Sequence, residues 1–221
     1  MERHFDEQLA ALKNQLIRMS ALAELMITDA IKMLVQRDGS VLPAINQHEA
    51  EVNRLQLEVD EICLTLIALH QPAAGDLRFI LGAAKTNTDL ERLADQAVNI
   101  SHKAERLMKE APLKPFVIIP EMARLASAMV KDSLHAYVNR EIEKAREIIQ
   151  RDRYLNELKA RVTDELLDFM KSDPASAGRA LDIILVAHNL ERIGDHAKNI
   201  AENTIFVVEG KDIRHGGEQH N

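Results

Sequence analysis

The sequence has little of what builds disulfides, nucleotide-binding loops or β-sheets. Its 221 residues include 1 cysteine, so neither a disulfide within the chain nor a cluster of thiolate metal ligands can form. The 8 glycines form no phosphate-binding loop, which argues against P-loop and Rossmann nucleotide sites. We expect the reducing cytosol as the compartment, and Cys63 as a packed thiol rather than a catalytic one.

A long apolar run and an excess of basic residues are also missing. No run approaches the ~20 apolar residues that cross a bilayer, and the first residues, MERHFDEQ, are too charged for a signal sequence. The net charge is −7 with acids and bases mixed throughout, unlike the basic surfaces that bind nucleic acid. We therefore expect a cytoplasmic protein with no membrane insertion and no nucleic-acid partner.

Residues that favour helices are abundant instead. Aromatic residues make up 3% of the chain, whereas Ala, Leu, Glu, Lys and Met are frequent. Apolar residues of the first segment recur in alternating steps of three and four: Leu9, Leu12, Leu16, Met19, Ala23, Met26, Ala30 and Met33. This spacing is typical of a helix that packs lengthwise against others. Five breaks divide the chain into six expected helices, which end near residues 38, 70, 108, 139, 171 and 210. The third break is a linker with Pro112, Pro115 and Pro120. The expected fold class is therefore all-α.

Local signals at the breaks predict how the helices begin and end. We expect Gly39 directly after the first helix, Ser40 as the cap of the second helix, and Pro43 in its first turn. Asp173 is expected to cap the last helix, with Pro174 in the first turn.

One segment of the sequence occurs twice. TDLERLADQAVNIS at residues 88–101 recurs as HNLERIGDHAKNIA at residues 188–201, with seven identities in fourteen positions. The chain is therefore predicted to form two tandem three-helix bundles, a six-helix bundle with an internal pseudo-twofold repeat. The predicted units are residues 1–110 and 111–210, and residues 211–221 are expected to be a flexible tail.

Oxygen-bearing side chains form a second row on each repeated helix, beside the apolar stripe. The row has two acids and an asparagine at i, i+4 and i+8: Glu91, Asp95, Asn99 and Glu191, Asp195, Asn199. Acids four residues apart repel mildly in a helix, yet both copies keep them while positions 88, 89, 96 and 98 differ. A bound cation would explain this, and a solvated helix face is the alternative.

The preceding helix of each unit offers more oxygen ligands at the same spacing: Glu49, Asn53 and Asp152, Asn156. If short turns make the paired helices antiparallel, residue 51 lies opposite residue 93, and residue 154 opposite residue 193. Each unit then assembles one oxygen-rich patch of candidate metal ligands. Such ligands favour Mg²⁺, Mn²⁺, Ca²⁺ or iron over a structural zinc. His188 could add a nitrogen ligand or be a surface histidine.

Patterns for catalysis are missing. The Glu-x-x-His pair of di-iron oxidases is absent, because Ala94 and Gly194 stand three residues after the acids. No Ser/His/Asp or Cys/His arrangement occurs at a useful spacing. We predict a protein that is not an enzyme. The alternatives are a metal-dependent enzyme acting on phosphate compounds and a metal-free helical scaffold.

Several segments together resemble one family. The two LERxxDxxxNI segments, the run GDLRFILGAAKTNTDLERLAD and the final NIAENTIFVVEGKDIRH make the sequence similar to the PhoU family of bacterial phosphate-transport accessory proteins. The resemblance implies two three-helix repeats, a homodimer and a cytoplasmic regulator without catalysis. It implies the ATP-binding subunit of the phosphate ABC transporter and the phosphate-sensing histidine kinase as partners. The implied role is negative regulation of the Pho regulon and restraint of phosphate uptake.

The resemblance also bears on metal. Some members of the family carry iron or zinc clusters on paired E(D)xxxD motifs, and others have been seen without metal. Glu91/Asp95 and Glu191/Asp195 match this motif, while the pairs that begin at Glu49 and Asp152 end in asparagine instead of an acid. Iron, zinc or a metal-free chain are therefore all compatible with the resemblance.

Overall fold

The computed structural model describes residues 2–213, which form six α-helices, two short 3₁₀ turns and no β-strand. The helices are α1 (Glu2–Gln36), α2 (Leu42–His70), α3 (Ala74–Met108), α4 (Ile118–Asn139), α5 (Ile142–Ser172) and α6 (Ala177–Glu209). The predicted all-α fold with six helices is confirmed. Residues 211–213 follow α6 without helical structure, and the rest of the predicted tail, residues 214–221, lies outside the described residues.

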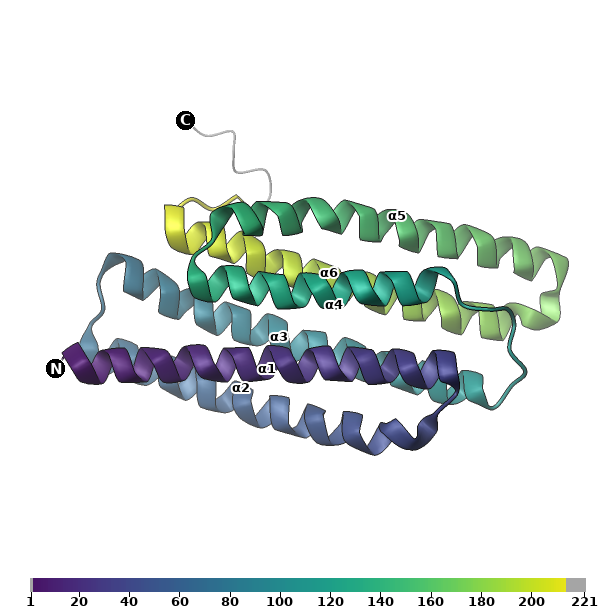
Figure 1. Ribbon diagram of the computed structural model, residues 1–221, viewed down its shortest axis with the longest axis horizontal. Helices are drawn as coiled ribbons and strands as arrows, with labels where there is room; N and C mark the ends of the chain where they lie inside the picture. The colour runs from purple at the N-terminus through teal and green to yellow at the C-terminus, as the bar shows by residue number, and fades with distance from the viewer. Residues whose placement is uncertain (1, 214–221) are drawn as a thin grey trace.

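The helices lie lengthwise in tiers, in the order α5, then α4 with α6, then α1 with α3, then α2 (Figure 1). α3 packs along α6 and α1 along α4, so the α1–α3 unit and the α4–α6 unit share one core. α2 and α5 lie on the outside and pack against the two other helices of their own units. Within residues 2–213, none of these helices has the length and apolar character needed to cross a membrane.

The two repeats bury corresponding positions. With an offset of 103, three buried residues of α2 correspond to three of α5: Val52, Leu55, Val59 and Leu155, Leu158, Val162. With an offset of 100, buried positions of α3 correspond to those of α6, such as Leu90 with Leu190. Burial of such apolar side chains contributes about 1.5–3 kcal/mol each, which explains why a three-and-four spacing specifies these faces. Cys63 is buried as expected, and burial raises the pKa of its thiol to about 12.

One buried contact differs between the repeats. A Cβ atom added to Gly194 of α6 would lie 2.3 Å from Leu155 Cδ2 of α5. The corresponding residues of the first repeat, Ala94 and Val52, are larger and smaller respectively, and both are buried. The missing methyl group of Gly194 therefore makes room for the longer Leu155.

Helix ends follow the sequence signals in part. Pro43 lies in the first turn of α2, as predicted. The prediction that Gly39 follows α1 directly is wrong, because α1 ends at Gln36 and Arg37 takes the left-handed conformation with φ 57°. Arg37 donates hydrogen bonds to three carbonyl oxygens at the end of α3, and these contacts compensate the strained backbone. The prediction that Ser40 caps the second helix is also wrong. Asp38 caps the 3₁₀ turn Gly39–Val41 that precedes α2, and its carboxylate accepts a hydrogen bond from the N–H of Ser40.

At the last break, Asp173 accepts a hydrogen bond from the N–H of Ala175, and Pro174 follows it as predicted. This cap begins a 3₁₀ turn, Pro174–Ser176, that leads into α6. Gly210 ends α6 in the left-handed conformation with φ 71°, which glycine adopts without strain.

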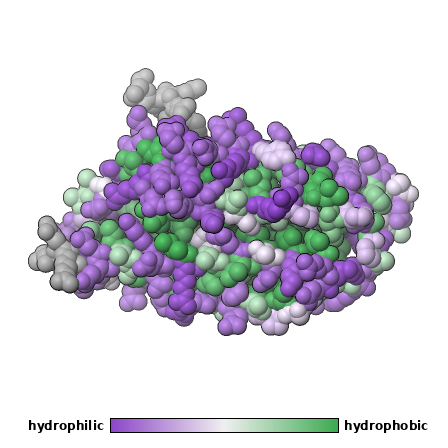
Figure 2. All heavy atoms as spheres, in the orientation of Figure 1, coloured by the Kyte–Doolittle hydropathy of each residue, from purple (hydrophilic) through white to green (hydrophobic). Residues whose placement is uncertain are grey.

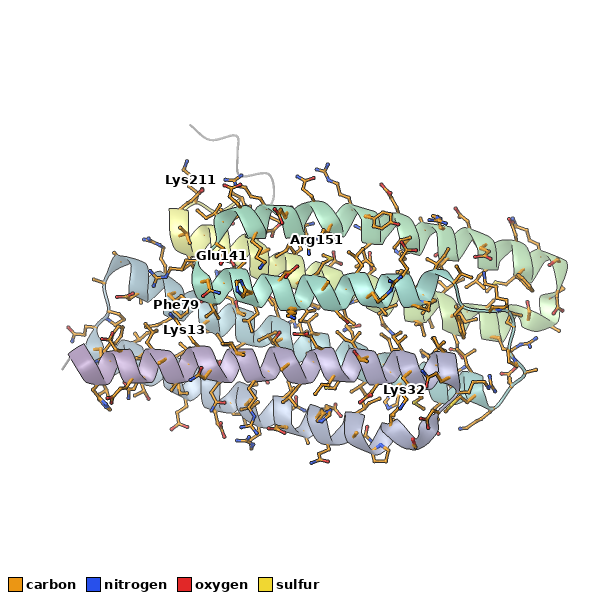
Figure 3. All side chains as sticks on the ribbon, in the orientation of Figure 1. Lys13, Lys32, Phe79, Glu141, Arg151 and Lys211 are labelled. Carbon is orange, nitrogen blue, oxygen red and sulfur yellow. The ribbon has the colours of Figure 1, made fainter. Side chains whose placement is uncertain are left out.

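An aromatic stack joins helices of the two units. Phe79 of α3 stacks on Tyr137 of α4 with ring centres 5.0 Å apart, and the Tyr137 hydroxyl donates to the Phe79 carbonyl. Lys13 of α1 completes the contact, with its Nζ 5.2 Å from the centre of the Phe79 ring (Figure 3). α1, α3 and α4 are therefore fixed to one another at this end of the bundle.

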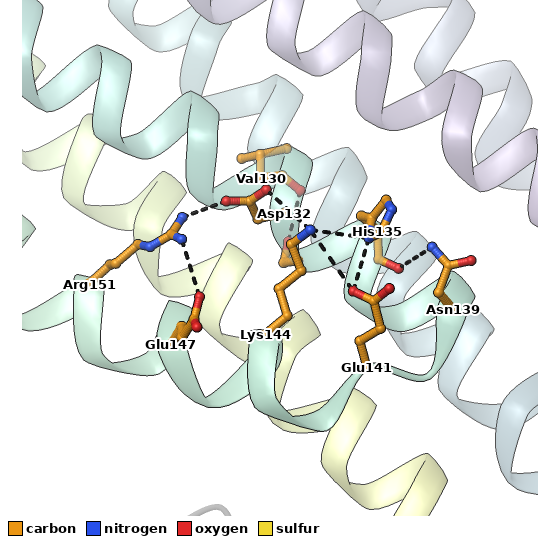
Figure 4. A network of polar contacts seen from close by, with 9 residues as sticks. Val130, Asp132, His135, Asn139, Glu141, Lys144, Glu147 and Arg151 are labelled. Carbon is orange, nitrogen blue, oxygen red and sulfur yellow. Dashed lines mark hydrogen bonds and ion pairs between the residues drawn. The ribbon is translucent and has the colours of Figure 1, made fainter.

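The outer surface of α4 combines a groove and a polar network. Apolar side chains gather where α1 meets α4 (Figure 2), and a groove of about 250 Å³ there includes Ile17 and Leu134. On the other side, Asp132 of α4 pairs with Arg151 and Lys144 of α5 (Figure 4). These half-buried ion pairs link α5 to α4 and still reach solvent, so each adds only about 0–1 kcal/mol of stability.

Candidate functional site

The second-repeat patch, defined by Asp152, Asn156, Glu191, Asp195 and Asn199, lies where α5 packs on α6. Asp152 is 4% exposed, and its Oδ2 accepts hydrogen bonds from Lys198 Nζ at 3.2 Å and from Asn156 Nδ2 at 3.5 Å. Asp152 Oδ1 is buried and has no hydrogen-bond partner. One oxygen of this carboxylate is therefore satisfied and the other is not, which is costly in a buried position.

Glu191 has a basic side chain at each of its two oxygens. Lys159 Nζ of α5 lies 3.7 Å from Oε1, and His188 Nδ1 lies 3.0 Å from Oε2. The sequence predicts that residue 154 of α5 lies opposite residue 193 of α6. Two ion pairs, Asp152 with Lys198 and Lys159 with Glu191, agree with this antiparallel alignment to within one helical turn. The predicted antiparallel alignment of α5 and α6 is confirmed.

The acids of the second-repeat patch influence one another. Burial, and then the charges of Glu191 and Asp152, raise the pKa of Asp195 above its usual value. Burial alone would lower the pKa of Lys198, but the hydrogen bond to Asp152 and the charges of Asp152, Glu202 and Asp195 outweigh it and raise this pKa. The Lys198 ammonium is therefore held in its charged form among the carboxylates.

The first-repeat patch is defined by Glu49 and Asn53 of α2 and by Glu91, Asp95 and Asn99 of α3, two helices that pack against each other. Asn87 of α3 donates to the carbonyl of Gln56 and to Asp60 of α2, which confirms the predicted alignment of these helices. Burial, and then the neighbouring Asp95, raise the pKa of Glu91. None of the five patch residues forms a hydrogen bond or ion pair with any side chain in residues 2–213.

One predicted ligand faces the other repeat. Asn199 donates to Asp89 Oδ1 of α3 at 3.2 Å, and His196 Nδ1 lies 2.9 Å from the same oxygen. His196 is buried, so this contact joins α3 to α6 inside the interface between the repeats. Asn199 is therefore engaged with Asp89 rather than with Asp152.

The two patches differ in how they suit a metal ion. The carboxylates of the first-repeat patch are unpaired and partly desolvated, and such oxygens suit a hard cation. The second-repeat patch has its own ammonium groups on two of its three acids. Within residues 2–213, no group of three or more His, Cys, Asp or Glu side chains is arranged around one metal position. A metal that needs about six oxygens would have to take further ligands from water.

Comparison with known proteins identifies the family. The family model for the PhoU domain matches residues 16–104 and again residues 119–204. The chain belongs to the PhoU family. A phosphate-specific transport system accessory protein PhoU homolog of Clostridium acetobutylicum is 36% identical over 95% of this chain and 96% of its own length. The homolog of Pseudomonas putida is 32% identical over 98% of this chain and 85% of its own length.

Solved PhoU structures have the same fold. The crystal structure of PhoU from Pseudomonas aeruginosa superposes with a TM-score of 0.90 at 31% identity, over 93% of this chain and 99% of that one. The phosphate transport system regulatory protein PhoU from Streptococcus pneumoniae superposes with a TM-score of 0.86 at 23% identity, over 95% and 99% of the two chains. The second likeness shows the fold alone.

Three residues that contact the carboxylates of this PhoU-family chain escape a search for oxygen ligands: Lys159, His196 and Lys198. A comparison of the repeats position by position would have found them. Lys198 stands where the first repeat has Val98, and Lys159 where it has Gln56. When both repeats have the same acids but only one has a lysine beside them, the lysine is a signal for an internal ion pair.

Proposed function

We propose that this chain is a cytoplasmic regulator without catalytic activity that couples phosphate uptake to phosphate-starvation signalling. As a homodimer it contacts the ATP-binding subunit of the phosphate ABC transporter and the phosphate-sensing histidine kinase. When phosphate is plentiful it restrains uptake and represses the Pho regulon.

The observation that carries this proposal is the similarity to phosphate-specific transport system accessory proteins over nearly the whole chain. Both repeats take part in the match to the PhoU family model, at residues 16–104 and 119–204. The accessory role in phosphate transport comes directly from these relatives, and the coupling to a kinase is the step that we add.

Exposed leucines at corresponding positions support contact with partner proteins. In the first repeat Leu64 is 69% exposed and Leu81 46%, and in the second repeat Leu167 is 43% and Leu181 52% exposed. Leu64 corresponds to Leu167, 103 residues later, and Leu81 corresponds to Leu181, 100 residues later. Each repeat therefore has a pair of solvent-facing leucines near its short turn. Apolar side chains that both copies keep in water suit a surface covered by another protein.

Metal binding is the second part of the proposal. In the first repeat, Glu49, Glu91 and Asp95 hold a divalent or trivalent metal ion that links α2 to α3, with further ligands from water. The unpaired state of these acids supports this role, because a cation would relieve the repulsion between Glu91 and Asp95. Iron and zinc are the ions that the family resemblance suggests, and the oxygen ligands also suit Mn²⁺.

Deletion of the gene tests the regulatory role. In the deletion strain at high phosphate, a reporter driven by a phosphate-starvation promoter should be expressed constitutively, and the intact gene on a plasmid should restore repression. Normal repression in the deletion strain would refute the proposal.

The leucine pairs allow a sharper test of partner contact. Leu64→Glu combined with Leu167→Glu should weaken co-purification with the transporter ATP-binding subunit and leave the thermal unfolding temperature unchanged. Leu57→Glu is the matched control, because Leu57 is 70% exposed but has an alanine, Ala160, at the corresponding position. Equal co-purification of the double variant and the control would remove the leucine pairs from the interface.

A further inference from the structure

Two of the three acids of the second-repeat patch pair with basic side chains of the same chain. Lys198 pairs with Asp152, and Lys159 and His188 pair with Glu191. The corresponding positions of the first repeat carry uncharged side chains: Gln56 for Lys159, Thr88 for His188 and Val98 for Lys198. At each of the three positions the second repeat has a basic side chain and the first repeat has an uncharged one. The two patches therefore differ in whether the chain itself places basic groups beside the acids.

A metal ion at the second-repeat patch would meet the Lys198 ammonium beside the carboxylates of Asp152 and Asp195. Two cations in contact with the same acids repel each other strongly where water is partly excluded. Both oxygens of Glu191 are also engaged, so they are not free to coordinate. In the first-repeat patch the place of Lys198 is taken by Val98, which brings no charge.

We infer that Lys198, assisted by Lys159 and His188, takes the place of a metal ion in the second repeat and leaves the first repeat as the metal-binding one. This inference rests on the proposed metal role of the patches. It departs from the family resemblance, which treats the two repeats alike. The buried Asp152 Oδ1 has no hydrogen-bond partner, so removal of Lys198 would leave the Asn156 amide as the one side chain among residues 2–213 that donates to this carboxylate.

Titration with Mn²⁺ distinguishes the repeats. The full-length chain is stripped of metal with a chelator and titrated with Mn²⁺, and the free ion is measured by electron paramagnetic resonance. Glu91→Ala with Asp95→Ala should abolish binding, whereas Glu191→Ala with Asp195→Ala should leave the bound Mn²⁺ per chain unchanged. Equal losses in the two double variants would overturn the inference.

Exchange of residues between the repeats tests the role of the lysines directly. In the triple variant Lys159→Gln, His188→Thr and Lys198→Val, the second repeat takes the residues of the first, and bound Mn²⁺ per chain should about double. The reciprocal variant Val98→Lys places an ammonium near Glu49, by analogy with Lys198 and Asp152, and should abolish binding at the first repeat. Helical content from circular dichroism shows whether each variant is folded.

The outcomes separate this inference from the proposed function. If the triple variant does not fold, Val98→Lys decides, and full Mn²⁺ binding by a folded Val98→Lys protein overturns the inference. Absence of Mn²⁺ binding by the parent and the triple variant alike also overturns it. The regulatory role would be unaffected by either result, because the gene-deletion experiment measures repression without any metal titration.

Discussion

In the first repeat Glu91 and Asp95 form no ion pair with the rest of the described chain, whereas in the second repeat Asp152 and Glu191 are held by lysines. Both patches come from one duplicated segment on helices that pack in the same way. The difference shows that the two repeats share the packing stripe and the acids, while only the second repeat places lysines on its acids. Buried or half-buried acids need some such partner, because desolvation disfavours the charged form.

Loss of the internal cation should have the largest effect on stability. Lys198→Met leaves the buried Asp152 without its lysine, and we expect the free energy of unfolding to fall by about 2 kcal/mol, less than for a fully buried pair because Lys198 is partly exposed. Urea unfolding of the metal-free protein measures this. Val98→Met is the control at the corresponding position, where an apolar exchange should cost less than about 1.5 kcal/mol. Similar losses in the two variants would contradict the unequal roles of these positions.

The packing difference at Gly194 gives the next effect. Gly194→Ala adds a methyl group against Leu155 and should lower the free energy of unfolding by about 1.5 kcal/mol, despite the better helix propensity of alanine. Addition of Leu155→Val restores the combination found in the first repeat, Ala94 with Val52, and should recover most of the loss. A double variant no more stable than the single one would show that the two positions do not compensate each other.

The contact between the repeats is also unequal. His196 pairs with Asp89, whereas the corresponding positions are Gln96 and Asn189. His196→Gln should lower the free energy of unfolding by about 1 kcal/mol, the typical net contribution of one hydrogen bond within a protein. Thermal unfolding at neutral pH measures it, with Gln96→His as the reciprocal control. No change in His196→Gln would mean that Asp89 finds another partner of equal strength.

The pH dependence of Glu91 should be the smallest effect. Because the folded state raises the pKa of Glu91, its contribution to stability is present below the ordinary value of 4.5 and is lost as the pH rises through the raised value. Glu91→Gln should therefore stabilise the metal-free protein by about 0.3 kcal/mol at neutral pH and by almost nothing near pH 4. Urea midpoints at the two pH values test the sign, and a destabilised variant at neutral pH would contradict it.

The sequence predicts the helices well because their buried faces repeat every three or four residues, and the same stripe occurs in both units. It fails at the end of α1, where tertiary contacts of Arg37 with the end of α3 allow a left-handed arginine before Gly39. Local propensity cannot reveal a contact with residues 70 positions away.

In the candidate site too, the features set by local spacing were predictable from the sequence, and those set by packing between the repeats were not. The acids and their alignment across α2 and α3 follow from spacing and from the antiparallel turn. The attachment of Asn199 to Asp89 depends instead on how α6 packs against α3, which lies in the other repeat. The lysines at 159 and 198 were visible in the sequence, but only a comparison of the two patches gives them meaning.

The most direct test is to locate the metal. Crystals of the full chain grown with Mn²⁺ should show an anomalous scattering peak beside Glu91 and Asp95 and none beside Asp195, with Lys198 still on Asp152. Peaks of equal height at both patches, with Lys198 displaced from Asp152, would contradict the account.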